Sequence, residues 1–277
     1  MKYYSTNNKN NKVDLKTAVI KGLADDKGLY MPMVLPEMPE SFFRDITKMD
    51  FRELASQLAI RLFGQDVPKN DLRDICENAF NFETPVVSIN ENISTLELFH
   101  GPTLAFKDVG ARFMARMLGY FIADENEEVH VLVATSGDTG SAVANGFLKV
   151  PGIKVHVLYP KGLVSPLQEK QFTTLEKNIT ALEIDGSFDD CQRLVKQAFS
   201  DEELNRKIRL TSANSINLAR LLPQVFYYFN AWRQAEKKDN LVICVPSGNF
   251  GNLTAGLIAM KMGLPIKHFI AATNIND

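Results

Sequence analysis

One lysine of the chain stands where its amine could do covalent chemistry. Lys107 follows Phe106 in the segment 99–108 (FHGPTLAFKD), between an apolar run typical of a strand and an amphipathic helical pattern. Apolar surroundings and the positive end of a helix both disfavour a charged amine, and an uncharged lysine can form a Schiff base with an aldehyde. The alternative is a solvated lysine beside Asp108, since most lysines are exposed.

Two other segments share the order strand, polar loop and helix. The first has the loop 135–141 (TSGDTGS) after the run VHVLVA, and the second has the loop 246–252 (PSGNFGN) after LVICV. Glycine allows close backbone approach, and free amides at a helix N-terminus attract anions. An ordinary helix cap is the alternative for either loop alone. Two such loops at strand ends of one sheet indicate a ligand with two anionic groups.

The same two loops weaken other ligand classes. Neither contains the G-x-G-x-x-G pattern of dinucleotide sites or the phosphate loop of nucleoside triphosphatases. Neither contains G-x-S-x-G, because Ala134 and Val245 stand at the required glycine positions. Dinucleotide, nucleotide and serine-hydrolase functions are therefore disfavoured.

Composition excludes several further classes. The 277 residues are 45% hydrophobic and 23% charged, which is typical of a globular chain and not of a disordered or fibrous one. A net charge of −2 argues against a basic nucleic-acid binder. The three cysteines form no C-x-x-C pair, and the histidines show no metal-ligand spacing, so we expect no metal site. The N-terminus is polar, and no apolar run reaches 18 residues, so we expect a cytoplasmic protein without a membrane partner.

Strands and helices alternate after residue 84, and this order must position the three segments. An open, doubly wound α/β arrangement is therefore predicted, with near-continuous apolar runs such as VLVA and LVICV as strands buried on both faces. Before residue 84 the pattern is mostly helical after a polar arm. The predicted strands are PVVSI, TLELF, VHVLVA, KVHVLY, ITALEI, LVICVP and FIAAT. The predicted helices cover 51–62, 70–80, 108–122, 140–149, 166–175, 188–199, 216–234 and 252–262.

Three units are expected along the chain. Residues 1–84 form an N-terminal cap, 131–205 a small mobile α/β lobe with TSGDTG, and 85–130 with 206–277 a large lobe with Lys107 and PSGNFGN. The C-terminus reads as a buried strand followed by a short loop. We therefore expect a longer polypeptide, or another segment, to complete the large lobe.

The three segments, in this order, closely resemble the threonine synthase family. HGPTLAFKDVG at 100–110 is similar to the family's lysine signature, TSGDTGSA at 135–142 to its substrate-side loop, and PSGNFGN at 246–252 to its cofactor-phosphate loop. The segments 18–32, 160–171 and 214–224 extend the resemblance over essentially the whole chain. It implies a pyridoxal-phosphate (PLP) enzyme of fold type II, built like the tryptophan synthase β-subunit with a helical N-terminal cap.

The resemblance also implies roles for individual residues. Lys107 would carry the cofactor and shuttle protons, and Asp138 stands where related enzymes often carry asparagine. The cofactor-binding residues would be Phe106, Lys107, Ser247, Gly248, Asn249, Phe250, Gly251 and Asn252. The substrate-binding residues would be Thr135, Ser136, Gly137, Asp138, Thr139, Lys161, Asn214, Asn217 and Arg220.

The implied reaction converts O-phospho-L-homoserine and water to L-threonine and phosphate, the last step of threonine biosynthesis. Two alternatives stay open. One is another PLP lyase of this fold, such as a threonine or serine dehydratase. The other is an inactive, PLP-free fragment that acts only by association, because family chains run past residue 277. The sequence does not distinguish a monomer from a homodimer.

Overall fold

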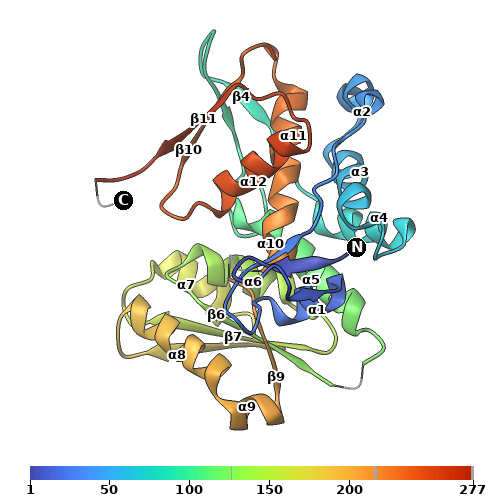
Figure 1. The fold of residues 1–277 in the computed structure, drawn as a ribbon. Coiled ribbons are helices and arrows are strands. Elements are labelled where there is room, and N and C mark those ends of the chain that lie inside the picture. The colour runs from blue at the N-terminus through green and yellow to red at the C-terminus, as the bar shows by residue number, and fades with distance from the viewer. Residues whose placement is uncertain (126, 215–216, 276–277) are drawn as a thin grey trace.

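The described part of the chain covers residues 1–125, 127–214 and 217–275 of a computed structural model. It contains three small sheets and one larger parallel sheet, and β10 (Val242–Pro246) and β11 (His268–Ala272) extend away from the helices (Figure 1). This mixed α/β architecture confirms the predicted fold class.

The N-terminal region holds a small antiparallel sheet followed by helices. Its strands pair in the order β2-β1-β3, which the sequence did not predict because each is only two or three residues long and lies in a polar arm. The helical cap was predicted. Its elements are β1 (Tyr3–Ser5), β2 (Lys12–Val13), α1 (Leu15–Lys21), β3 (Tyr30–Pro32), α2 (Glu40–Asp45), η1 (Ile46–Lys48), α3 (Phe51–Phe63) and α4 (Lys69–Ala79).

Side-chain caps begin several of the helices. Asp14 accepts the Thr17 amide at the start of α1, and Asp50 accepts the Glu53 amide at the start of α3. In α3 the apolar side chains recur at helical spacing, so one face is buried against the core.

A four-stranded parallel sheet dominates the middle of the chain. Its order is β8-β7-β6-β9, with helices on both faces (Figure 1). β6 pairs in register with both β7 and β9, from Val129 opposite Ile153 and Arg209 onward. β9 was not predicted, since it has only four residues. The elements are α5 (Lys107–Ile122), β6 (Val129–Ala134), α6 (Asp138–Phe147), β7 (Ile153–Pro160), α7 (Pro166–Thr173), β8 (Ile179–Ile184), α8 (Phe188–Ser200), α9 (Glu202–Lys207) and β9 (Arg209–Ser212).

The strand carrying PSGNFGN lies in a different, two-stranded parallel sheet with β11. The prediction that both strands are buried is wrong for this chain: Val242 is 43% exposed and Ile270 52% exposed. Each of the two strands has only the other as a described strand neighbour, and most of their side chains are exposed or half-buried. The remaining elements are β4 (Val86–Ser88), β5 (Ser94–Leu96), α10 (Leu218–Leu221), η2 (Leu222–Gln224), α11 (Val225–Gln234), β10 (Val242–Pro246), α12 (Gly251–Lys261) and β11 (His268–Ala272).

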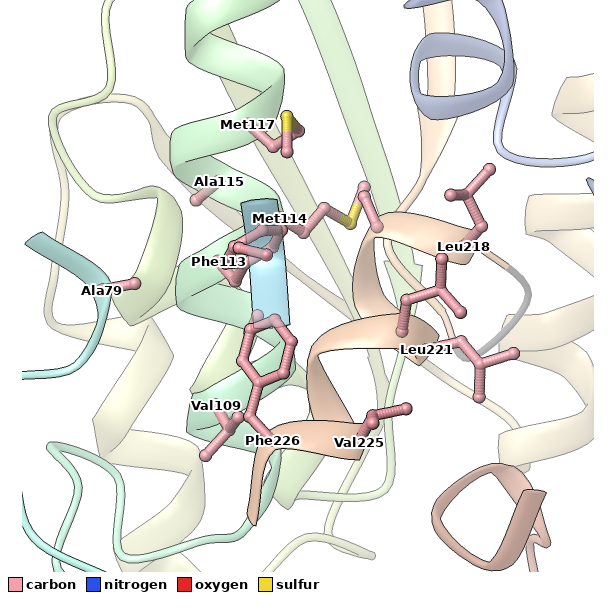
Figure 2. Close-up of a cluster of buried hydrophobic side chains, with 14 of the residues drawn as sticks. Ala79, Val109, Phe113, Met114, Ala115, Met117, Leu218, Leu221, Val225 and Phe226 are labelled. Atoms are coloured by element: carbon pink, nitrogen blue, oxygen red, sulfur yellow. The ribbon is translucent and has the colours of Figure 1, made fainter. Parts of the chain in front are cut away.

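Helix α5 is the centre of the apolar core. Figure 2 shows its side chains facing those of α10 and α11, among them Phe113 against Phe226, whose ring centroids lie 5.7 Å apart. Because Lys107 is the first residue of α5, this packing also fixes the backbone that carries the amine. Among the described residues, no helix is both long enough and apolar enough to cross a membrane.

The predicted division into units cuts the larger sheet. The boundary at 130/131 falls inside β6, and the boundary at 205/206 separates β9 from β6, its sheet neighbour. The three-unit division stays a prediction, and its small lobe would need to run from β6 through β9 to keep this sheet intact.

Candidate active site

The loop before Lys107 is held by a buried carboxylate. Asp108 is fully buried and accepts the Thr103 amide at 2.9 Å and the Thr103 hydroxyl at 2.7 Å. Burial raises the pKa of Asp108 above its ordinary value. Gly101 packs so closely against this carboxylate that a Cβ would lie 2.5 Å from Asp108 Oδ2. Asp108 therefore shapes the loop that delivers Lys107 to the site.

The Lys107 amine begins a chain of polar contacts that reaches α7. Nζ donates to Asp138 Oδ2 at 3.2 Å, and Gln168 Nε2 donates to Asp138 Oδ1 at 2.5 Å. The Ser165 hydroxyl donates to Gln168 Oε1 at 2.8 Å. Asp138 thus lies against the amine, and its carboxylate, which only accepts hydrogen bonds, matches a donor-only ammonium group. Gln168 was not predicted, because nothing in its local pattern marks it and only the fold brings α7 to Asp138.

The TSGDTG loop satisfies much of its own backbone. Thr135 Oγ1 accepts the amides of Gly137 at 2.9 Å and Gly140 at 2.8 Å, and it donates to the Gly137 carbonyl at 3.0 Å. Gly137 has a φ of 147°, and a Cβ there would lie 2.5 Å from Gln168 Oε1. The Ser141 hydroxyl also donates to the Gly137 carbonyl. The loop is a tight scaffold that leaves Ser136 and Thr139 to face a ligand.

The PSGNFGN loop has the opposite character. Within the described residues, the amides from Gly248 to Asn252 donate to no backbone or side-chain acceptor. They precede and open α12, whose first residue is Gly251. Consecutive free N–H groups at a helix N-terminus attract an anion such as a phosphate. A Cβ at Gly248 would meet nothing within 4 Å, so the space in front of this residue is open.

One cavity of about 300 Å³ joins the lysine and both loops. Of the predicted site residues, the structure brings together around it Phe106, Lys107, Thr135, Ser136, Thr139, Arg220, Ser247, Gly248, Asn249, Gly251 and Asn252. Residues that were not predicted also line it, namely Gly110, Ala134, Phe188 and Gln224.

Arg220 is a second cationic side chain in the lining of this cavity, after Lys107. It is 3% exposed, and burial lowers its pKa to about 10. Its guanidinium contacts the Ala213 carbonyl, and no carboxylate lies within 4 Å of it among the described residues. Gly110 makes room for it in α5, since a Cβ would lie 2.6 Å from the Arg220 carbonyl oxygen. A helix-interior glycine is the sequence signal that could have identified this contact. A buried guanidinium without a carboxylate is suited to an anionic ligand.

Other predicted residues lie away from the cavity lining. Asn217 is buried, caps α10 and donates to the Val19 carbonyl at 2.8 Å, so it ties α10 to α1. Asn214 lines a different cavity. Lys161 is exposed, and Phe250 is 45% exposed. Gly137 and Asp138 are adjacent to the cavity, and Asp138 reaches it through Lys107.

Comparison with known proteins gives the class of this fold and site. Residues 82–276 match the family described as "Pyridoxal-phosphate dependent enzyme", and the chain belongs to that family. Residues 2–80 match "Threonine synthase N terminus".

Within that family the chain is similar to threonine synthases. It is 51% identical over 280 residues to threonine synthase of Buchnera aphidicola subsp. Baizongia pistaciae and 50% identical over 279 residues to that of Escherichia coli. Both alignments cover 100% of this chain and 65% of the relative, so the chain spans about 65% of the length of these curated relatives. The predicted resemblance is thereby confirmed.

Solved structures agree with the sequence comparison. The crystal structure of E. coli threonine synthase superposes with a TM-score of 0.93 at 48% identity, covering 100% of this chain and 65% of that one. PLP-bound threonine synthase from Brucella melitensis gives 0.92 at 40% identity, covering 100% and 61%.

Proposed function

We propose that this protein acts as a threonine synthase, converting O-phospho-L-homoserine and water to L-threonine and phosphate with PLP as cofactor. The observation that carries the proposal is that one cavity joins a lysine amine to two separate anion receptors, the amides of 248–252 and the Arg220 guanidinium. A phosphorylated aldehyde cofactor and a phosphorylated amino acid together need that combination.

The residues of the cavity fit PLP. The Lys107 amine can bond to the aldehyde carbon, and the free amides of residues 248–252 can donate hydrogen bonds to the phosphate oxygens. When bound, PLP supplies an electron sink for the substrate carbons that lose protons.

The chain's own groups would then position the substrate and move protons. Lys107 Nζ, tethered beside the reacting carbon, would take up and return protons. Asp138 holds that nitrogen, and Gln168 holds Asp138. The Arg220 guanidinium would bind an anionic group of the substrate, and Ser136 and Thr139 would donate to its polar atoms. Lys161, Asn214 and Asn217 stay predictions without support from this cavity.

A threonine or serine dehydratase is the alternative to test against. Purified protein with added PLP should develop a visible absorption band. Borohydride reduction should abolish this band and leave reduced PLP covalently attached to Lys107 as a label. Phosphate should then be released from O-phospho-L-homoserine, whereas ammonia release from threonine or serine would favour the dehydratase.

Lys107→Ala tests the role of the amine, with Lys161→Ala as the matched control. The first variant should lose the band and the label, and the second should keep both. Stability should change by less than about 1 kcal/mol in either variant, because Lys107 loses one partly exposed ion pair and Lys161 is an exposed side chain. A labelled Lys107→Ala protein, or no band in the parent protein with excess PLP, would contradict the proposal.

A cytoplasmic location also stays a prediction.

A further inference from the structure

A larger cavity lies elsewhere in the molecule, and it shares no lining residue with the Lys107 cavity. Its volume is about 1060 Å³, enough for a small organic molecule. One wall comes from residues 16–29, which include most of α1 and the turn before β3. The other comes from residues 192–214, which include α8 and β9. The cavity therefore lies between the N-terminal region and the larger sheet.

The walls are held together by a shared ion pair. Glu125, which follows α5, lies 2.6 Å from Lys16 Nζ of α1 and also contacts the Arg209 guanidinium of β9. The Lys16 ammonium and the Arg209 guanidinium hold the pKa of Glu125 below its ordinary value. Glu125 thus links α1 to β9 beside the cavity.

The charge of the lining is strongly positive. Of the residues that the structure describes, five basic side chains and one acidic side chain, Asp25, line the cavity. Lys16 and Arg209 are paired with Glu125, and Lys21 is paired with Asp25. Lys27 and Lys196 remain, one on each wall, and within the described residues neither lies within 4 Å of a carboxylate. Each wall therefore offers an anion in the cavity one exposed ammonium group without a carboxylate partner among the described residues.

The interior of the cavity is apolar. Ile20, Val195 and Leu210 line it and are at least nine-tenths buried, at 4%, 5% and 8% exposure. Apolar walls with a few charged groups are the usual composition of a small-molecule site, where the charges set orientation. Inorganic phosphate alone would leave these walls without a partner.

We infer that this cavity is a second ligand site, which binds a small organic anion with an apolar body held between Lys27 and Lys196. The anionic end lies between the two ammonium groups, and the apolar body contacts Ile20, Val195 and Leu210. Because the ligand contacts both walls, its binding ties α1 to α8 and stabilises the folded chain.

Two dyes of matched shape test the ligand class. 8-Anilinonaphthalene-1-sulfonate carries two apolar ring systems and a sulfonate, and N-phenyl-1-naphthylamine carries the same rings without a charge. The anionic dye should bind about fivefold or more tightly than the neutral dye, the ratio that two partly exposed ion pairs give. Equal affinities would overturn the proposed class of ligand.

The charge-reversal variant Lys27→Glu/Lys196→Glu tests the site. It should weaken the anionic dye about fivefold or more and leave the neutral dye unchanged. Lys69→Glu/Lys261→Glu carries the same net charge change on exposed residues of α4 and α12 and should leave both affinities unchanged. Equal losses in the two variants would overturn the assignment.

Ser200→Trp provides an independent check if the charge reversals disturb folding. Ser200 is an exposed residue of the lining, so a large ring there can obstruct part of the cavity without removing a core side chain. The variant should lose the saturable binding of both dyes and keep the circular dichroism spectrum of the parent. Unchanged binding in this folded variant would overturn the proposal.

Discussion

The loop after β6 and the loop after β10 both join a parallel strand to a helix, yet they treat their backbone amides in opposite ways. In the first, Thr135 Oγ1 accepts the amides of Gly137 and Gly140 in a buried turn. In the second, the amides of 248–252 have no acceptor within the described residues. The first loop is therefore a rigid support for Asp138, and the second offers its backbone to an anion.

The strands that carry these loops differ in the same sense. β6 lies between two strands and under helices, and Val129, Val131 and Val133 are fully buried. β10 has one strand neighbour, and Val242 is 43% exposed. A strand's apolar composition thus indicates what it can bury, while its neighbours decide how much it does bury.

The largest difference between the two regions is expected at their hydroxyl groups. Thr135→Val keeps the shape of the side chain and leaves two buried amides without an acceptor, so it should lower the free energy of unfolding by about 2–4 kcal/mol. Ser247→Ala removes one hydrogen bond to the Asn249 carbonyl on an exposed loop and should cost less than about 0.5 kcal/mol. Denaturant unfolding followed by circular dichroism measures both, and equal costs would contradict the contrast.

A smaller difference is expected at matched valines of the two sheets. Val131→Ala in β6 removes fully buried methyl groups and should cost about 2 kcal/mol. Val242→Ala in β10 should cost less than about 0.5 kcal/mol, because its side chain is already in contact with water. The same unfolding experiment applies. A cost at Val242 as large as that at Val131 would show that β10 is covered in solution, for example by a second copy of the chain.

The smallest effect on stability is expected from a change in pH, and it arises from two histidines of the larger sheet. His130 of β6 and His156 of β7 stack with parallel rings, with His130 Nδ1 3.0 Å from His156 Nε2. Burial lowers the pKa of both below the ordinary 6.5, and Lys154 acts in the same direction. The unfolded chain therefore binds more protons below pH 6.5, so stability is complete above that pH and falls as the pH drops further.

Melting temperatures at pH 7.5 and 5.5 would measure this effect. The melting temperature should be lower at the acid value, and His156→Gln should reduce the difference. His268→Gln, on exposed β11, controls for the loss of a histidine. The histidine pair would not be responsible if both variants reduced the difference equally.

Much of the fold could be predicted because its elements carry local signals. The helical spacing in 51–62 predicted α3, and the apolar runs predicted β6, β7 and β8 at nearly their observed bounds. β9 and the N-terminal sheet were missed because strands of two to four residues have too little pattern to separate from loops. Burial of β10 could not be predicted, because it depends on which elements lie beside it.

Site residues that act through their backbone could be predicted from the sequence. The prediction failed for residues whose place in the site depends on tertiary contacts. Lys107 and the two glycine loops were recognised from their strand–loop–helix order, and one cavity does join them. The expectation that both loops end strands of one sheet is wrong, because β6 and β10 lie in different sheets. Asn217 is polar and close to Arg220 in sequence, but a helix cap turns it toward α1 and away from the cavity. Gln168 reaches Asp138 only because α7 packs beside α6, which no local pattern reveals.

A continuous chain of hydrogen bonds runs from Lys107 Nζ through Asp138 and Gln168 to Ser165, the N-cap of α7. This chain couples the amine to the start of that helix. Any change in bonding at Nζ alters what Asp138 accepts, and Asp138 in turn holds the side chain that anchors the first turn of α7. We therefore expect a spectroscopic reporter on the exposed residues of α7 to register a change in bonding at the amine.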